Sequence, residues 1–360
     1  MIRRTARITG MDQAVRRFAD ELLHAHDRAL VEMLRSLNEG GTVDHDRALI
    51  DNLLRLYEGK RVEHDTAHTH MLLNVHERKR IDQIGAVDKG VQILLSLKYK
   101  DMLHQQLPLP PLADVEFRSH SQNGEDGILL YIFSLVGTTN KKTVEMCAGT
   151  GIECNSANLI LNHKWDGLLF DGDPQYVAWG RDFFARSKDT HWRQPTFVHA
   201  WITADNVNDV IAAQGVAGEI DLFSLDMDGV DYWIWKAIDC VSPRVVVLEF
   251  NWIWGADRSV TIPYDPKFVN TDPSGRNGGN GFAYFGGSLP AFVKLAKTKG
   301  YRLIGTESWG FNAFFLRNDV GPDILPEVDA AECFKIPMQL ATRTSQMLSV
   351  MDPAWQWVEV

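Results

Sequence analysis

The chain is 360 residues long, and its 45% hydrophobic and 23% charged residues are typical of a globular protein rather than a disordered or low-complexity one. Acidic residues outnumber basic residues by 47 to 37, and a formal charge of -10 disfavours a protein that grips nucleic-acid phosphates over a broad face. The four cysteines form no CxxC pair, which favours a reducing compartment over a disulfide framework or a zinc ribbon.

The sequence predicts no membrane segment. The longest apolar run, residues 127–137, is roughly half of the ~20 residues that a membrane helix needs, and the basic start leads into no signal-peptide core. We therefore expect a soluble, cytoplasmic protein with neither a membrane nor a nucleic acid as partner.

The first 107 residues follow a helical pattern, in which apolar residues recur at three- and four-residue steps between charged neighbours. Two glycines at positions 40–41 end the first helix, a second helix is expected over about residues 43–58, and the last over about residues 83–103. This pattern predicts an all-α N-terminal domain. Its apolar stripes suit core packing, a homo-oligomer surface or a cover over a substrate.

Residues 108–116 are expected to be a linker, because prolines at positions 108, 110 and 111 cannot continue a helix. Beyond it, short apolar runs alternate with helical stretches over residues 117–320, a pattern typical of parallel βαβ units, and residues 321–360 form a C-terminal extension. The expected strands are residues 143–147, 167–171, 196–200, 220–225, 245–250, 301–306 and 312–316. We therefore expect an α/β fold, a Rossmann-like, doubly wound sheet of seven strands.

The first expected strand runs into a turn with Gly149 and Gly151, at the sheet edge where α/β proteins bind cofactors. About twenty residues later the second strand ends in Asp171 and Asp173, and an acidic residue at that distance typically accepts hydrogen bonds from ribose hydroxyls. A glycine pair alone is often only a tight turn. Together with the carboxylates it predicts a nucleoside site, although spacing does not choose the cofactor.

Longer sequence motifs indicate which cofactor the predicted nucleoside site binds. The spaced residues Glu145, Cys147, Gly149 and Gly151 resemble the E/DxGxGxG motif of class I S-adenosylmethionine-dependent methyltransferases, with Cys147 in place of the first glycine. The strings SQNGEDG (121–127), VEMCAGTGIECN (144–155), GLLFDGD (167–173) and SLDMDGVDYW (224–233) resemble the FkbM-like branch of those enzymes. The resemblance covers about residues 117–318.

The resemblance implies S-adenosylmethionine as the cofactor. It places Glu145 and Gly149 along the methionine part and Asp171 or Asp173 at the ribose. The residues expected to bind the cofactor are Gln122, Glu125, Glu145, Gly149, Gly151, Asn155, Asp171, Asp173 and Trp201. For Gln122 and Glu125, a helix N-terminus capped by Ser121 or Asn123 explains the pattern equally well.

Candidate oxygen ligands for a metal ion lie at the ends of the fourth and fifth strands. Asp226 and Asp228 come after the fourth strand, and the fifth strand ends in Glu249-Phe250-Asn251. Because these strand ends are neighbours in a doubly wound sheet, the side chains converge, and buried carboxylates need a compensating cation. Carboxylate and amide oxygens suit Mg²⁺ or Mn²⁺, which would help an acceptor hydroxyl to lose its proton.

We expect Asp226, Glu249 and Asn251 as metal ligands and Asp228 as a fourth. This set is similar to the carboxylate and amide ligands of catechol-type and macrolide-sugar O-methyltransferases. Plain structural alternatives are a turn at residues 228–229, a helix cap at Asp231 and an Asx-turn at Asn251.

Residues 252–287 form a long stretch between the fifth and sixth strands, which is expected to be a substrate lid. Arg258 would orient an anionic or polyhydroxylated substrate, and Tyr264 would stack against a sugar ring. With Asp226 and Glu249 they are the expected catalytic residues, although an exposed arginine is often only solvated.

These residues predict an S-adenosylmethionine-dependent O-methyltransferase, assisted by a divalent metal, that acts on a hydroxyl of a sugar or glycosylated metabolite. Two alternatives stay open. Asp226-Met227-Asp228 is a DxD pair of the kind that metal-dependent glycosyltransferases use, and the chain could also be a non-catalytic scaffold.

Overall fold

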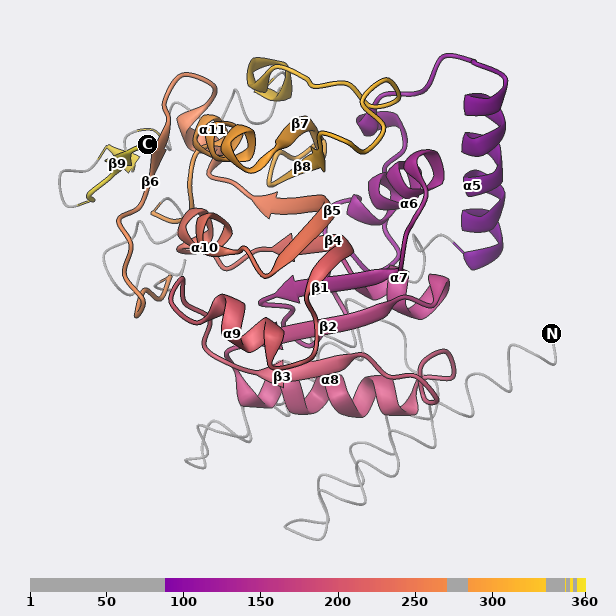
Figure 1. Ribbon diagram of the computed structural model, residues 1–360, viewed down its shortest axis with the longest axis horizontal. Coiled ribbons are helices and arrows are strands. Elements are labelled where there is room, and N and C mark those ends of the chain that lie inside the picture. The colour runs from indigo at the N-terminus through magenta and orange to yellow at the C-terminus, as the bar shows by residue number, and fades with distance from the viewer. Residues whose placement is uncertain (1–87, 271–283, 335–346, 348–349, 352–354) are drawn as a thin grey trace, which may run out of the picture. The chain divides into compact units, whose positions relative to one another are not determined.

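The computed structural model describes residues 88–270, 284–334, 347, 350–351 and 355–360 (Figure 1). These residues belong to one compact unit, Ile84–Val360. The chain's other unit, Met1–Gln83, lies outside the described residues, and so do the helices expected there. In the described part, every helix is too short or too polar to cross a membrane.

A seven-stranded sheet in the order β3-β2-β1-β4-β5-β8-β7 forms the centre of the unit (Figure 1). Its strands are β1 (Lys142–Met146), β2 (Asp166–Asp171), β3 (Thr196–His199), β4 (Gly218–Leu225), β5 (Val241–Glu249), β7 (Tyr301–Thr306) and β8 (Asn312–Arg317). Strands β1 to β5 are parallel, and β8 lies antiparallel between β5 and β7. All seven expected strands and the Rossmann-like sheet are confirmed.

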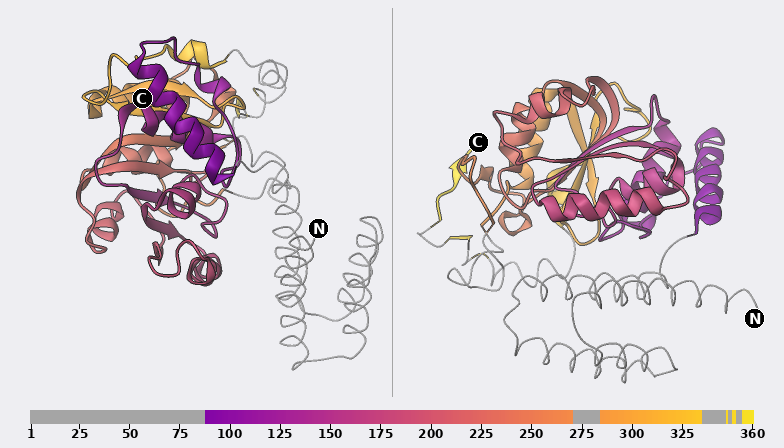
Figure 2. Two further views of the ribbon diagram at one scale, coloured as in Figure 1. Left: turned by 90° about the vertical axis from the view of Figure 1, so that its right-hand side faces the viewer. Right: turned by 90° about the horizontal axis from the view of Figure 1, so that it is seen from below.

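Successive residues of a strand point to opposite faces of the sheet, and here both faces carry apolar residues. Both faces of the sheet must therefore be covered by helices. In β5, Val245 and Val247 pack on one face and Val246 and Leu248 on the other. The first face is covered by α5 (Lys89–His104), α6 (Glu125–Val136), α7 (Ala157–His163) and α8 (Pro174–Arg186). The second is covered by α9 (Val207–Ala212), α10 (Asp231–Ala237) and α11 (Leu289–Lys299) (Figure 2).

Helix α5 packs on the sheet domain. Its Tyr99 meets Tyr131 of α6 edge to face, with ring centroids 4.9 Å apart. Its fully buried Gln92 accepts a hydrogen bond of 3.0 Å from Asn158 of α7. The last helix that the sequence assigns to the N-terminal domain therefore belongs to the sheet domain, which starts well before residue 117.

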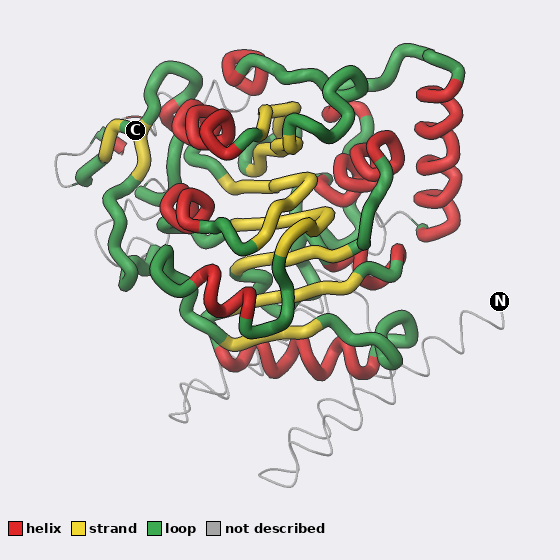
Figure 3. Tube along the Cα trace, in the orientation of Figure 1, coloured by secondary structure: helices red, strands yellow, loops and turns green. Residues whose placement is uncertain are grey.

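Short elements complete the unit (Figure 3). They are η1 (Leu112–Asp114), η2 (Trp252–Trp254), η3 (Ala330–Phe334), β6 (Val260–Thr261) and β9 (Val358–Glu359). Strands β6 and β9 pair antiparallel, so the end of the C-terminal extension returns to the stretch expected to be a lid. The sequence does not predict this pair, since two residues carry no periodicity.

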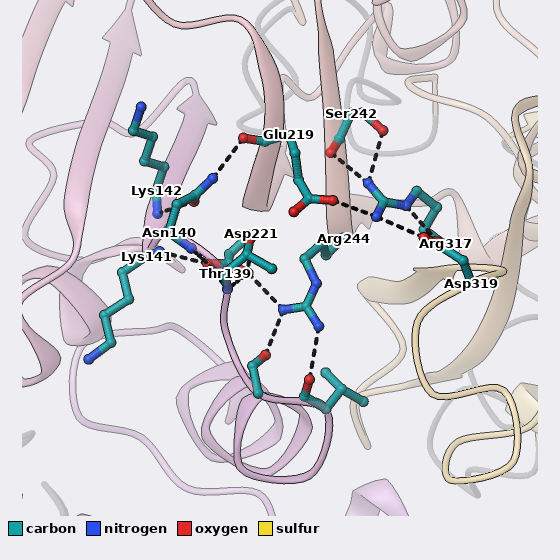
Figure 4. Close-up of polar contacts among 12 residues, drawn as sticks. Thr139, Asn140, Lys141, Lys142, Glu219, Asp221, Ser242, Arg244, Arg317 and Asp319 are labelled. Carbon is teal, nitrogen blue, oxygen red and sulfur yellow. Dashed lines mark hydrogen bonds and ion pairs between the residues drawn. The ribbon is translucent and has the colours of Figure 1, made fainter.

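A buried ion pair holds the edge of the sheet where the parallel strands begin (Figure 4). Asp221 of β4 accepts a 2.8 Å hydrogen bond from Arg244 of β5 and further bonds from the amides of Thr139, Asn140 and Lys141. This network fixes the loop before β1, at the opposite edge from the candidate site.

Candidate functional site

The turn after β1 opens onto the edge where the parallel strands end. Cys147, Gly149 and Gly151 have φ angles of 56°, 58° and 68°, a left-handed conformation that favours glycine. Apart from Gly149 itself and its two chain neighbours, no atom of the described residues lies within 4 Å of the place where a Cβ on Gly149 would be, whereas a Cβ on Gly151 would lie 3.0 Å from the Phe184 ring. The glycine at 149 therefore leaves space for a ligand, and the glycine at 151 allows close packing.

Asp171, at the end of β2, contacts this turn directly. Its two carboxylate oxygens accept hydrogen bonds of 2.8 Å from the amides of Gly149 and Asp173. Burial raises the pKa of Asp171, and these hydrogen bonds oppose that shift. Asp173 is instead the N-cap of α8, where it accepts a 2.7 Å bond from the amide of Gln175. Of the two residues expected at a ribose, Asp171 is the one that faces the glycine turn.

The half-exposed ring of Trp201 lies beside the same strand end. A Cβ on Gly172 would come 3.3 Å from this ring, and the indole nitrogen donates a 2.8 Å hydrogen bond to the carbonyl of Pro266. Trp201 therefore borders the turn after β2 and holds part of the stretch expected to be a lid.

Glu145 supports the turn after β1 from inside the protein. Its carboxylate accepts hydrogen bonds of 2.9 Å and 2.7 Å from the amides of Asn155 and Ser156, at the start of α7. The Asn155 side chain donates to the hydroxyl of Ser224, which in turn contacts Glu145. Burial raises the pKa of Glu145. Glu145 and Asn155 are thus brought together, as positioning residues for the turn.

Glu125 is the first residue of α6, and its side chain binds the backbone just before the helix. It is fully buried and accepts hydrogen bonds of 2.8 Å and 2.9 Å from the amides of Asn123 and Gly124, and one of 2.8 Å from the side chain of Asn312. The N-cap residue is Gly124, but the Ser121 hydroxyl accepts a 3.0 Å hydrogen bond from the amide of Asp126 in the first turn of α6. The alternative in which Ser121 caps this helix N-terminus is therefore confirmed.

Gln122 is exposed and lines a cavity of about 500 Å³ beside this helix end. The other residues around the cavity are Glu116, Phe117, Arg118, Asn123, Gly124 and Trp309. A carboxylate, a guanidinium, two carboxamides and an indole ring thus share one hollow.

Asp226, Asp228 and Glu249 form an acidic group in which one oxygen of each lies within 4.8 Å of the others. It is the one set of this kind found in the described part of the chain. Burial, with the charges of the neighbouring carboxylates, raises the pKa of Asp226 to about 7 and also raises that of Glu249.

One oxygen of Glu249, Oε2, is buried without a hydrogen-bond partner among the described residues. Buried acceptors are costly when unpaired, and three convergent oxygen donors are the ligands that hard divalent cations prefer. The residues therefore fit a cation such as Mg²⁺ or Mn²⁺.

Two neighbouring polar residues have other partners. Asp231 accepts hydrogen bonds from the amides of Met227 and Gly229, at 2.7 Å and 2.9 Å, and so braces the turn that carries Asp228. Asn251 is fully buried; its oxygen accepts from the amide of Ile253 at the start of η2, and its nitrogen donates to the carbonyl of Phe285. The Asx-turn alternative for Asn251 is what the structure shows.

Arg258 and Tyr264 do not join the acidic group. The Arg258 guanidinium forms an ion pair with Glu359 and lies 5.2 Å from the centre of the Trp254 ring. The Tyr264 hydroxyl donates a 3.0 Å hydrogen bond to Asp205. Both residues fasten the stretch expected to be a lid, and their partners are too distant in sequence for spacing to reveal.

Asn312 is a residue of this edge that the sequence did not single out. It begins β8 and pairs directly with Glu249 of β5. The expected strand over residues 312–316 contained it, but only the antiparallel insertion of β8 beside β5 brings it to the acidic group.

No family model and no curated protein sequence matches the chain. Among solved structures, it is similar to magnesium protoporphyrin IX methyltransferase from Synechocystis PCC 6803 with bound S-adenosylmethionine, at 11% identity over 48% of this chain and 67% of that one, with a TM-score of 0.28. It is also similar to the glycopeptide N-methyltransferase MtfA complexed with S-adenosylmethionine, at 10% identity over 49% of this chain and 81% of that one, with a TM-score of 0.31.

Spermidine synthase from Thermotoga maritima is a third similar structure, at 13% identity over 58% of this chain and 70% of that one, with a TM-score of 0.31. Likenesses this distant carry no activity over to this chain. The resemblance to the FkbM-like branch accordingly stays a prediction.

Proposed function

We propose that this chain is an S-adenosylmethionine-dependent methyltransferase that acts on a hydroxyl oxygen with the help of a divalent cation. The observation that carries the proposal is that two candidate subsites lie side by side along the edge where the parallel strands end. One is the glycine turn with Asp171, and the other is the acidic group of Asp226, Asp228 and Glu249. Cys147 directly follows β1, and β1 pairs with β2, which ends at Asp171, on one side and with β4, which Asp226 follows, on the other. A nucleoside at Asp171 would thus reach the acidic group.

The cofactor subsite uses three features of the chain. Asp171 keeps lone pairs beyond the two that its backbone donors occupy, so it can also accept from ribose hydroxyls. Gly149 permits close approach of a ligand, and Trp201 offers a half-exposed ring to a flat base. S-adenosylmethionine would supply the activated methyl group, and the protein would align it with the acceptor.

The acidic group would hold the cation. Asp226, Asp228 and Glu249 provide the oxygens, and the hydrogen bonds that Asp231 accepts keep the turn of Asp228 in place. Mg²⁺ or Mn²⁺ would supply positive charge that favours loss of the proton from the acceptor hydroxyl.

For the acceptor, we propose a sugar or a glycosylated metabolite. The cavity beside α6 supports this class, because the half-exposed Trp309 ring and the polar side chains around it suit the faces and hydroxyls of a sugar. This cavity adjoins the start of β8, whose Asn312 pairs with Glu249.

Calorimetric titration tests the proposal against its two alternatives. We expect S-adenosylhomocysteine to bind and uridine diphosphate with Mn²⁺ not to bind. Binding of the diphosphate alone would favour a metal-dependent glycosyltransferase built on the Asp226-Met227-Asp228 pair, and binding of neither would favour a non-catalytic scaffold.

The variant Asp226→Ala tests the role of the metal. It should abolish methyl transfer and leave the affinity for S-adenosylhomocysteine nearly unchanged, because Asp226 lies in the acidic group and not at Asp171. The matched control is Asp189→Ala, an exposed carboxylate after α8, which should change neither quantity. Full methyl transfer by Asp226→Ala would remove the metal from the proposal.

A further inference from the structure

Asn312 lies beside the acidic group. It is only 6% exposed, and it pairs directly with Glu249 in the antiparallel ladder between β5 and β8. Directly opposite residues of such a ladder project to the same face of the sheet, with Cβ atoms about 4.5–5.5 Å apart. The Asn312 side chain is therefore a neighbour of a carboxylate that already lies within 4.8 Å of Asp226 and Asp228.

The orientation of the Asn312 amide is fixed by Glu125. The Nδ2 atom donates a 2.8 Å hydrogen bond to the Glu125 carboxylate, which can only accept when ionised. The Nδ2 end of the amide, and not the oxygen Oδ1, therefore faces the Glu125 carboxylate. Oδ1 is buried without a hydrogen-bond partner among the described residues, as is Oε2 of Glu249.

Two buried acceptors without a donor, on side chains that are neighbours across the ladder, call for a positively charged or donating group, because an unpaired buried acceptor costs about 1–3 kcal/mol. A hard divalent cation meets this need, since carboxylate and carboxamide oxygens are its preferred ligands. A carboxamide adds no charge to a group that already has three carboxylates.

We infer that Asn312 is a further ligand of the divalent cation, through its side-chain oxygen, together with Asp226, Asp228 and Glu249. The inference rests on the proposed function for the presence of the cation. It gives Asn312 the role that the sequence assigned to Asn251, whose amide is occupied by the backbone at Ile253 and Phe285. Glu125, through its bond to Nδ2, is the positioning residue for this ligand.

Mn²⁺ titration followed by electron paramagnetic resonance tests the inference on the full chain without cofactor. Asn312→Ala should weaken Mn²⁺ binding at least about tenfold, a loss that even outer-shell groups cause at metal sites. The double variant Asn312→Asp with Glu125→Gln retains an oxygen ligand and a hydrogen bond to α6, so it should bind Mn²⁺ at least as well as the wild type.

Asn208→Ala is the matched control. Asn208 also makes side-chain hydrogen bonds, to the carbonyl of Ala237 and from the amides of Asp239 and Cys240, but it lies at the opposite edge of the sheet, next to the start of β5. This variant should bind Mn²⁺ like the wild type. Circular dichroism of each variant identifies any loss of folding.

The outcomes separate the inference from the proposed function. Wild-type Mn²⁺ affinity in folded Asn312→Ala, with loss of binding in Asp226→Ala, would overturn the role of Asn312 and leave the cation site in place. A wild-type chain that binds S-adenosylhomocysteine but no Mn²⁺ would overturn the inference and keep the cofactor proposal. A wild-type chain that binds neither S-adenosylhomocysteine nor Mn²⁺ would overturn both the inference and the proposed function.

Discussion

At the scale of single residues, Asp171 and Asp173 are two acids of one turn with different tasks. Asp171 bonds to the amide of Gly149, whereas Asp173 caps α8. Asp171→Asn loses the charge that ribose hydroxyls would donate to, and it leaves one backbone amide facing a donor. We expect the dissociation constant for S-adenosylhomocysteine to rise by about one to two orders of magnitude, at ~1.4 kcal/mol per tenfold change.

Asp173→Asn is the control for this pair, since asparagine is as good an N-cap as aspartate. It should leave the calorimetric dissociation constant close to that of the wild type. Equal losses in the two variants would contradict the assignment of Asp171 to the ribose.

The ion pair between Asp221 and Arg244 predicts a stability effect that is independent of ligand binding. Both side chains are buried, so removal of one partner should cost about 3–5 kcal/mol in the free energy of unfolding. We expect this loss in Arg244→Met by urea unfolding. Arg193→Met, which breaks an exposed ion pair with Asp166, should cost less than about 1 kcal/mol. Similar costs would contradict the role given to burial.

The same pair predicts a pH dependence. Burial by itself would raise the pKa of Asp221, but hydrogen bonds from Arg244 and from the amides of residues 139–141 outweigh it and lower the pKa. A carboxylate with a lowered folded pKa stabilises the protein above its unfolded pKa of ~3.9, and that stability is lost as the pH falls through the folded value. Unfolding free energies should therefore fall more steeply below about pH 4 in the wild type than in Asp221→Asn. Equal slopes would contradict this.

The sequence predicts which acidic residues lie together at the strand ends better than it predicts their partners. Asp171, Asp226 and Glu249 follow apolar strands, and parallel topology brings strand ends together. The roles of Arg258 and Asn312 depend on Glu359 and on the insertion of β8, which are long-range contacts that no local pattern encodes.

At the scale of elements, Gly180 of α8 shows packing that overrides helix propensity. A Cβ at this position would lie 2.2 Å from the Phe197 ring and 2.6 Å from the carbonyl of Thr150, in the glycine turn. Propensity alone would make Gly180→Ala more stable by about 1 kcal/mol, but overpacking costs about 1–3 kcal/mol. We expect a lower urea midpoint and weaker binding of S-adenosylhomocysteine.

Ala178→Gly is the matched substitution on the exposed side of the same helix. It should cost about 1 kcal/mol through propensity and leave ligand affinity unchanged. A Gly180→Ala variant more stable than the wild type would contradict the close packing of α8 on the glycine turn.

The seven strands could be predicted because each is a run of apolar residues buried on both faces, bounded by turn residues. The extent of the sheet domain could not. Proline-rich residues 108–116 indicate a helix end, but a helix that precedes such a segment can still pack on the sheet domain, as α5 does through Gln92 and Tyr99.

At the scale of the whole molecule, the N-terminal sequence with its apolar stripes is expected to form a homo-oligomer surface. The compact unit begins at Ile84, so a chain that lacks residues 1–83 retains it. Light scattering should give a smaller assembly for this truncated chain than for the full chain. Equal numbers of subunits per particle would contradict an oligomer role for the N-terminal part.

A crystal structure with S-adenosylhomocysteine and Mn²⁺ is the most direct test of the central claim, which is that one strand edge holds a nucleoside beside a cation. We predict adenosine density against Gly149 and Asp171, with a metal peak among Asp226, Asp228 and Glu249. An adenosine bound elsewhere on the protein, or a strand edge closed by the protein's own side chains in crystals grown at saturating ligand, would contradict the account.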